Sequence, residues 1–309
     1  MRRLFCLGLI GLLWFSAGPS HATDWTVVIV SSERSPAYEE AAEAAVAELV
    51  RGGVARREVH QMTAGEWQAS GGVAARLVVA LGLEASSVLA RSETKAAVLC
   101  TLLPRSGFER VLRDSGRRVS GQFTALYLNQ PLTRQLDLAR LALPQARRIG
   151  VLLGSESAQQ QALLEEAAHG RNLRLVSARV QAREPVFHEL KKILDDADVL
   201  LAMADPQIYN SSSIQNILLT SFRAQVPMLA FSPAYVRAGA LLAVYSTPTQ
   251  IGQQAGVMAR AFLQGRPLGA PQYPQEFNVS VNEHVARSLG LNLESNTLAE
   301  RLRRLEKGS

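Results

Sequence analysis

Short apolar runs alternate along the chain with longer segments whose apolar residues recur at helical spacing. Continuously apolar runs are typical of parallel strands buried on both faces. In the first half they predict strands at residues 25–30, 77–81 and 96–99, with a weaker strand at residues 54–61. Ser35-Pro36 predicts the start of a helix, and Gly52-Gly53 predicts its end.

The second half continues this alternation of strands and helices. Strands are predicted at residues 149–153, 174–179, 199–203, 228–231, 241–245 and 276–281. Helices are predicted at residues 130–143, 157–169, 186–194, 212–224 and 248–263. Residues 122–128 are expected to form an extended crossover, and residues 65–72 a loop. This order of elements predicts parallel sheets joined by right-handed crossovers.

The two halves of the chain also match each other. Thr26-Val-Val-Ile-Val-Ser-Ser-Glu33 matches Ile149-Gly-Val-Leu-Leu-Gly-Ser-Glu156, with an offset of 123 positions. Leu77-Val-Val-Ala-Leu-Gly-Leu-Glu84 matches Val199-Leu-Leu-Ala-Met-Ala-Asp-Pro206, with an offset of 122. We therefore predict an α/β fold of two doubly wound, Rossmann-like lobes that face one another across a cleft.

The length of 309 residues suits about two domains. We expect the first lobe to comprise residues 23–125 plus 247–272, and the second lobe residues 126–246 plus 273–309. Because the chain returns after both units are complete, it is expected to cross the hinge more than once. This organisation predicts a ligand-binding protein whose two lobes close on a small molecule.

The first 22 residues resemble a cleavable signal peptide. Arg2 and Arg3 precede an apolar core at residues 4–15, and Ser20-His21-Ala22 is a small-x-small cleavage site. The core is shorter than the roughly 20 apolar residues of a membrane span. We expect cleavage after Ala22 and a location in the periplasm, with an uncleaved N-terminal anchor as the alternative.

The charge and cysteine content argue against nucleic-acid binding and against an internal disulfide. The net charge of +6 falls to +4 without Arg2 and Arg3, and the basic residues form no dense patch, so nucleic acid is not an expected partner. Cys100 is the only cysteine after residue 22, so no internal disulfide is predicted. We expect a monomer.

Several segments of the second half together carry a resemblance to a known family. They are Ala146-Arg-Arg-Ile-Gly150, Gln225-Val-Pro-Met-Leu-Ala-Phe-Ser232, Tyr235-Val-Arg-Ala-Gly-Ala240, Gln250-Ile-Gly-Gln-Gln-Ala255, Phe277-Asn-Val-Ser-Val-Asn282 and Ala286-Arg-Ser-Leu-Gly-Leu291. In this order they resemble the substrate-binding proteins of uncharacterised ABC-type importers. The resemblance implies the type I periplasmic binding protein fold and an inner-membrane ABC permease as partner.

The first half departs from that family at two places. The chain has Asp114-Ser-Gly-Arg-Arg-Val-Ser-Gly121 where the family usually ends a Gly-rich segment in Asn-Val-Thr-Gly. It also has Gly82-Leu83-Glu84 where the family tends to have Gly-Thr-Pro. The departures leave open an accessory or sensory binding protein with a divergent pocket, which would not serve an ABC permease.

Candidate ligand-binding residues follow the predicted strands, because the crevice of an open parallel sheet lies outside the carboxyl ends of its strands. They are Ser31, Ser32, Glu33, Gly82, Leu83 and Glu84 in the first lobe, and Gly154, Ser155, Glu156 and Asp205 in the second. Hydroxyl groups and free helix N–H groups suit a carboxylate or phosphate. Asp205 or Glu84 could hold an amine, so a zwitterion such as an amino acid would satisfy both sets.

Three aromatic residues and a serine could complete the wall of the second lobe. They are Tyr209, Phe231, Ser232 and Tyr245. Each candidate also has a purely structural interpretation. Ser32 and Ser155 could serve only as helix N-caps, and the aromatic side chains could belong to the core.

An enzyme is not predicted. The chain has no G-x-x-x-x-G-K-[ST], no G-x-S-x-G and no H-E-x-x-H, and its histidines are scattered. We therefore expect no metal site and no cofactor. A periplasmic enzyme on the same scaffold is the third alternative, after the transport protein and the accessory binding protein.

Overall fold

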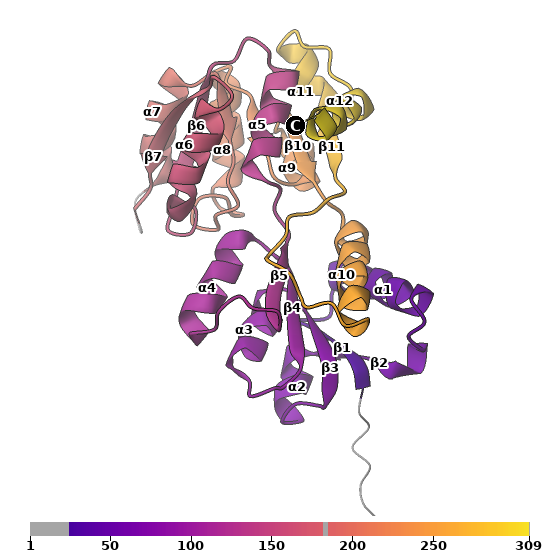
Figure 1. The fold of residues 1–309 in the computed structure, drawn as a ribbon. Coiled ribbons are helices and arrows are strands. Elements are labelled where there is room, and N and C mark those ends of the chain that lie inside the picture. Colours follow the sequence, from indigo (N-terminus) through magenta and orange to yellow (C-terminus); the bar gives the residue numbers. More distant parts are fainter. Residues whose placement is uncertain (1–24, 182–184, 309) are drawn as a thin grey trace, which may run out of the picture.

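The computed structural model describes residues 25–181 and 185–308. The predicted signal peptide lies outside these residues. Two α/β lobes are stacked one above the other and joined by thin connections (Figure 1). Within the described ranges, no helix is both long and apolar enough to cross a lipid bilayer.

The first lobe is built on a five-stranded parallel sheet with the order β2-β1-β3-β4-β5. Its strands are β1 (Trp25–Ser31), β2 (Val59–Thr63), β3 (Ala75–Leu81), β4 (Ala97–Leu103) and β5 (Phe123–Tyr127). Its helices are α1 (Pro36–Arg51), α2 (Ala64–Ala69), α3 (Leu83–Arg91), α4 (Arg105–Ser115) and the returning α10 (Pro248–Leu263), after a short 3-10 turn at Arg56–Glu58. Helices α1 and α10 cover one face, and α2, α3 and α4 cover the other.

The second lobe has a six-stranded sheet with the order β11-β10-β9-β8-β6-β7. Its strands are β6 (Arg148–Leu153), β7 (Arg174–Arg179), β8 (Val199–Leu201), β9 (Met228–Ala230), β10 (Leu242–Tyr245) and β11 (Asn278–Val281). Its helices are α5 (Leu132–Ala142), α6 (Gln161–His169), α7 (Val186–Asp196), α8 (Ile214–Arg223), α9 (Pro233–Ala238), α11 (Glu283–Ser288) and α12 (Ser295–Gly308), with a 3-10 turn at Ala158–Gln160. Apolar cores lie on both faces, one under α5, α6, α11 and α12 and the other under α7, α8 and α9.

The structure confirms the predicted fold class but differs from several predicted elements, and helices α4, α9, α11 and α12 were not predicted. Residues 122–128 contain a full strand, β5, because Phe123 to Tyr127 are buried and pair with β4. The weak second strand begins only at Val59. Helix α2 replaces the expected loop, since Thr63 and Glu66 form a capping box that satisfies its first N–H groups. Strand β11 is antiparallel.

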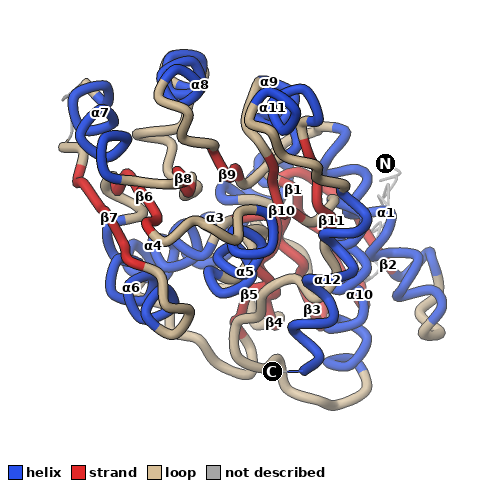
Figure 2. Tube along the Cα trace, turned by 90° about the horizontal axis from the view of Figure 1, so that it is seen from above, coloured by secondary structure: helices blue, strands red, loops and turns tan. Residues whose placement is uncertain are grey.

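Three connections join the lobes: one between β5 and α5, one between β10 and α10, and one between α10 and β11. Strand β10 ends at Tyr245, three residues before α10 begins on the first lobe. Helix α4, which follows β4, contacts the segment after β6 through side-chain hydrogen bonds. The carboxyl ends of both sheets therefore face each other, and Figure 2 shows the same molecule from above.

Candidate functional site

Asp205 organises the end of the second-lobe sheet. It follows β8, and only 1% of its surface is exposed. Its Oδ2 accepts hydrogen bonds from the backbone N–H groups of Glu156 (3.1 Å) and Ser157 (2.8 Å) and from the Ser157 hydroxyl (2.7 Å). Its Oδ1 accepts one from the backbone N–H of Gln207 (3.0 Å). The carboxylate thus fixes the loop after β6, and the expectation that it also contacts a ligand stays a prediction.

Gly154 and Ser155 lie in the loop that Asp205 holds. A Cβ on Gly154 would come within 2.7 Å of the Asp205 carboxylate, so only glycine fits there without displacing it. The N–H of Gly154 donates to the Ser157 hydroxyl (2.9 Å), and that of Ser155 donates to Gln207 Oε1 (2.9 Å). Ser155 itself is exposed. Ser157, which the sequence did not point to, holds this loop through its hydroxyl but makes no side-chain capping hydrogen bond to the turn that follows it.

Glu156 reaches across to the first lobe. Its carboxylate forms an ion pair with Arg110 of α4, and the hydroxyl of Ser106 lies 3.5 Å from the same carboxylate. One turn along α4, Arg113 donates to Gln159 (3.1 Å). The two lobes are therefore in direct polar contact at this edge. Arg110 was missed because only the loops after β1 and β3 were considered in the first lobe, and α4 follows β4.

Ser32 and Gly82 lie together at the end of the first-lobe sheet. The Ser32 hydroxyl donates to the Leu81 carbonyl (3.0 Å) and accepts from the N–H of Ala85 (3.1 Å) in the first turn of α3. Ser32 thus caps α3 rather than the helix that follows it in sequence. Gly82 has a φ of +92°, and a Cβ there would lie 2.6 Å from Ser32 Oγ and closer still to the Tyr38 hydroxyl. The turn requires glycine.

The remaining first-lobe candidates differ in what they offer. Ser31 ends β1 and its hydroxyl lies 3.5 Å from the Met62 carbonyl, while Leu83 opens α3 and is half-buried. Glu33 and Glu84 are exposed, and neither pairs with a cation in the described part of the chain. Their carboxylates are therefore free to meet a positively charged group.

A hollow of about 200 Å³ lies beside Glu33, between α1 and the ends of β1 and β2. Arg34 and Glu66 form an ion pair (2.7 Å) on its wall. Hydrogen bonds from the Thr63 backbone and from Arg34 hold the pKa of Glu66 below its usual range. Arg34 and Glu66 in the lining of this hollow therefore already neutralise each other's charge.

Aromatic rings gather at the ends of β8 and β9. Phe231 makes edge contacts with the rings of Tyr209 (6.0 Å) and Tyr235 (5.0 Å). Tyr209 is 4% exposed, and its hydroxyl has no hydrogen-bond partner among the described residues. Burial, with Asp205 nearby, raises the pKa of Tyr209. The structure thus brings Tyr209 and Phe231 together and adds Tyr235, which the sequence argument had not considered a site residue.

The outer members of this set are Ser232 and Tyr245. Ser232 is the N-cap residue of α9, although its side chain makes no capping hydrogen bond. Tyr245 ends β10 and packs against the core under α7, α8 and α9, as do Phe231 and Tyr235. Phe231, Tyr235 and Tyr245 are half-buried, so their rings are partly core and partly accessible.

One of the two sequence departures lies far from these loops. Arg117, within the segment from Asp114 to Gly121, donates to the carbonyls of Ala90 (2.9 Å) and Ser92 (2.8 Å) and lies over the Phe123 ring. These contacts are at the amino end of β5, opposite the facing loops. Only Gly82-Leu83-Glu84 departs from the family at the carboxyl ends.

A metal centre finds no support in the part of the chain that the structure describes. Three or more His, Cys, Asp or Glu side chains do not come together there. Cys100 is buried in the first-lobe core, and burial raises the pKa of its thiol to about 12.

Solved structures with two such lobes are similar over nearly their whole length. A conserved domain protein from Vibrio cholerae has a TM-score of 0.63 at 18% identity and covers 89% of this chain and 97% of its own. The ligand-free, open structure of a substrate binding protein with adhesive properties from Clostridium difficile has a TM-score of 0.67 at 16% identity, with coverage of 87% and 96%. An ABC domain in complex with L-Trp from Streptococcus pneumoniae has 0.63 at 16%, with coverage of 89% and 98%. The fold is that of the type I periplasmic binding proteins.

Sequence comparison identifies the family. A model of the family described as ABC transporter substrate binding protein matches residues 71–303. The chain belongs to this family. A tyrosine-binding protein from Clostridioides difficile is 24% identical over 191 residues, which are 60% of this chain, and the chain spans 54% of the length of that relative.

Proposed function

We propose that this protein is the periplasmic solute-binding component of an ABC-type uptake system and that it closes its lobes on an amino acid. The observation that carries the proposal is that the carboxyl ends of the two sheets face each other across a hinge of three chain connections. The two lobes are already in contact there through Glu156 and Arg110. A ligand that touches both edges binds the closed state better than the open one. Its differential affinity then shifts the population toward closure.

The two lobes offer groups that suit different parts of an amino-acid ligand. The unpaired carboxylates of Glu33 and Glu84 suit the ligand ammonium group, and the N-terminus of α3 suits its carboxylate. Phe231 and Tyr235 suit an apolar or aromatic side chain. The tyrosine-binding and tryptophan-bound relatives support this ligand class.

The signal-like residues 1–22 and the family membership support a periplasmic location and an inner-membrane ABC permease as partner. A sensory or accessory binding protein is the second candidate. The observation in its favour is Gly82-Leu83-Glu84, which stands at a carboxyl end in place of the Gly-Thr-Pro usual in the family. A receptor rather than a permease would then read the closed state.

Native mass spectrometry on protein produced from residue 23 onward tests the proposal, followed by calorimetry with L-Tyr, L-Trp, L-Leu and D-ribose. We expect a stoichiometric amino-acid adduct or binding of at least one amino acid. Phe231→Ala should weaken that binding by about 1–3 kcal/mol. Phe222→Ala is the matched control, because this phenylalanine is 50% exposed near the end of α8. Binding of ribose alone, or of none of these compounds, would contradict the amino-acid assignment.

A further inference from the structure

A buried arginine lies where the three connections meet. Arg134 is in the first turn of α5 and is 6% exposed. Its guanidinium donates to Gln130 Oε1 (2.7 Å), to the Pro274 carbonyl (2.8 Å) and to both carboxylate oxygens of Glu306 (2.5 and 3.0 Å). It also stacks over the Phe277 ring, with its central carbon 4.3 Å from the centroid. Four of the five N–H groups of this guanidinium are therefore engaged in hydrogen bonds.

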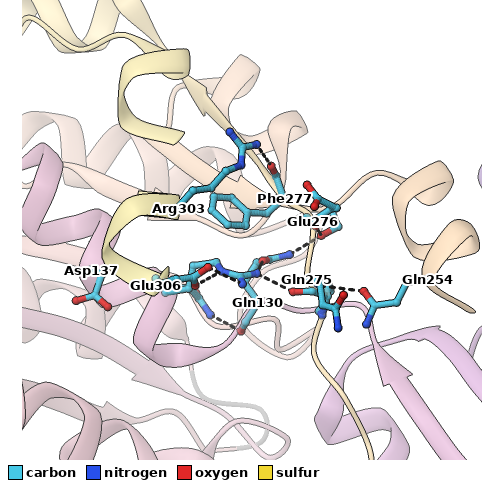
Figure 3. A network of polar contacts seen from close by, with 12 residues as sticks. Gln130, Asp137, Gln254, Gln275, Glu276, Phe277, Arg303 and Glu306 are labelled. Carbon is cyan, nitrogen blue, oxygen red and sulfur yellow. Dashed lines mark hydrogen bonds and ion pairs between the residues drawn. The ribbon is translucent and has the colours of Figure 1, made fainter. Parts of the chain in front are cut away.

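Gln130 extends the contacts to the second connection. Its amide donates to the Ser246 hydroxyl (2.9 Å), which donates in turn to the Glu276 carbonyl (2.5 Å). Gln130 belongs to the first connection, Ser246 to the second, and Pro274 and Glu276 to the third. Figure 3 shows Gln130, Glu276 and Glu306 in this network, with Gln130 lying between the two acids. One continuous set of buried hydrogen bonds thus joins all three.

The anion in this network comes from the last helix. Glu306 lies on α12, and Arg303 of the same helix donates to the Phe277 carbonyl (2.8 Å). Asp137, one turn along α5 from Arg134, is engaged by Arg171 (2.7 Å) and is not available to Arg134. The charge that balances the buried guanidinium therefore depends on α12. A buried ion pair that loses one member leaves an uncompensated charge.

We propose that Arg134 is a positioning residue of the hinge and that α12, through Glu306, holds the three connections in one arrangement and so sets the geometry between the lobes. The inference rests on lobe closure as the working motion of the proposed function. Rotation between the lobes must pass through these connections. Because Arg134 and Gln130 couple them, they move together, and a change at the C-terminal helix reaches the facing loops without touching a ligand.

Glu306→Gln tests the coupling, with Glu300→Gln as the matched control. Glu300 lies on the same helix but is largely exposed, and among the described residues its ion-pair partner is Arg304. In hydrogen exchange on the ligand-free protein, Glu306→Gln should speed exchange about tenfold at residues 128–130, 246–247, 273 and 275–277 together. The control should match the wild type. Faster exchange confined to α12 and β11 would show a purely local structural role and overturn the proposal.

Inter-lobe distances test the geometry. Spin labels at Glu93 and Lys192, both exposed and on different lobes, should give a broader distance distribution in Glu306→Gln than in the control. Arg134→Lys keeps the charge but loses the planar donors, and it should broaden the distribution as well. If either variant unfolds, the paired change Arg134→Met with Glu306→Leu removes the network without leaving a buried charge. Unchanged distributions in folded variants would refute the inference, and no ligand is needed for this readout.

Discussion

The two lobes tie their facing loops together in opposite directions and with different chemistry. In the first lobe, the hydroxyl of Ser32 after β1 reaches forward to the N–H of Ala85 in α3. In the second lobe, the carboxylate of Asp205 after β8 reaches back to the N–H groups of Glu156 and Ser157 after β6. A half-buried neutral group after the first strand of its lobe and a buried charged group after the third strand of its lobe thus join corresponding pairs of loops. The cost of removing them should differ accordingly.

The two lobes also differ in which of their polar groups are left exposed at the facing loops. Asp205 is engaged by the protein's own donors, and Glu156 pairs with Arg110. The first lobe leaves Glu33 and Glu84 exposed. Glu33 and Glu156 occupy matching positions in the repeat, but Glu33 is exposed and unpaired among the described residues whereas Glu156 forms an ion pair. The first lobe presents free charge, and the second presents aromatic rings after β8 and β9.

The largest effect is expected for Asp205→Ala. Four donors would lose their acceptor in a buried place, so the free energy of unfolding should fall by about 3 kcal/mol. Urea denaturation followed by circular dichroism measures the loss. Asp195→Ala is the control, because Asp195 is exposed on α7. Equal stability of the two variants would remove the distinction between the lobes.

Ser32→Ala should cost less, about 1 kcal/mol, because it removes one capping hydrogen bond from α3. Ser35→Ala provides the comparison, since Ser35 is the N-cap residue of α1 but its side chain makes no capping bond. The second variant should change stability by only a few tenths of a kcal/mol. Thermal unfolding of both proteins decides. A larger loss in Ser35→Ala would contradict the assignment of the cap.

Glu156→Gln should leave each lobe folded and loosen their contact. The ion pair with Arg110 is partly exposed, so its removal is worth about 0.5 kcal/mol, roughly a twofold change in the balance between lobes in contact and lobes apart. Spin-label distances across the lobes measure this shift. Glu166→Gln, on the exposed side of α6, is the control. Added salt should reduce the difference, and a salt-independent difference would speak against an electrostatic contact.

The smallest effect is on reactivity rather than stability. Burial raises the pKa of Cys100 to about 12, so a thiol reagent at pH 8 should not modify the folded first lobe. In the unfolded chain the pKa of a cysteine thiol is about 8.5, so the unfolded state loses its thiol proton first as pH rises. The free energy of unfolding should therefore be unaffected by Cys100 below about pH 8.5 and fall between that pH and about pH 12. Labelling kinetics in urea would report unfolding of the first lobe alone. Rapid labelling without denaturant would show that the first lobe opens on its own.

Most of the strands and helices could be predicted because the sequence signals that specify them are local. Apolar runs such as residues 77–81, and the Ser35-Pro36 start of α1, specify strands and helices from a few neighbouring residues. The order of those elements then implies parallel sheets and places candidate loops at their carboxyl ends. Residues 122–128 were not predicted as a strand of the sheet, because only their pairing with β4 shows that they form one.

The sequence by itself determined the two lobes, their family and the loops that face each other. Only the tertiary structure decided the partners of the charged side chains in and behind those loops. Arg110 and Glu156 are 46 positions apart, and Arg134 and Glu306 are 172 apart. Which acid meets which base depends on side-chain directions over a few ångströms, and those directions follow from long-range packing rather than from local pattern.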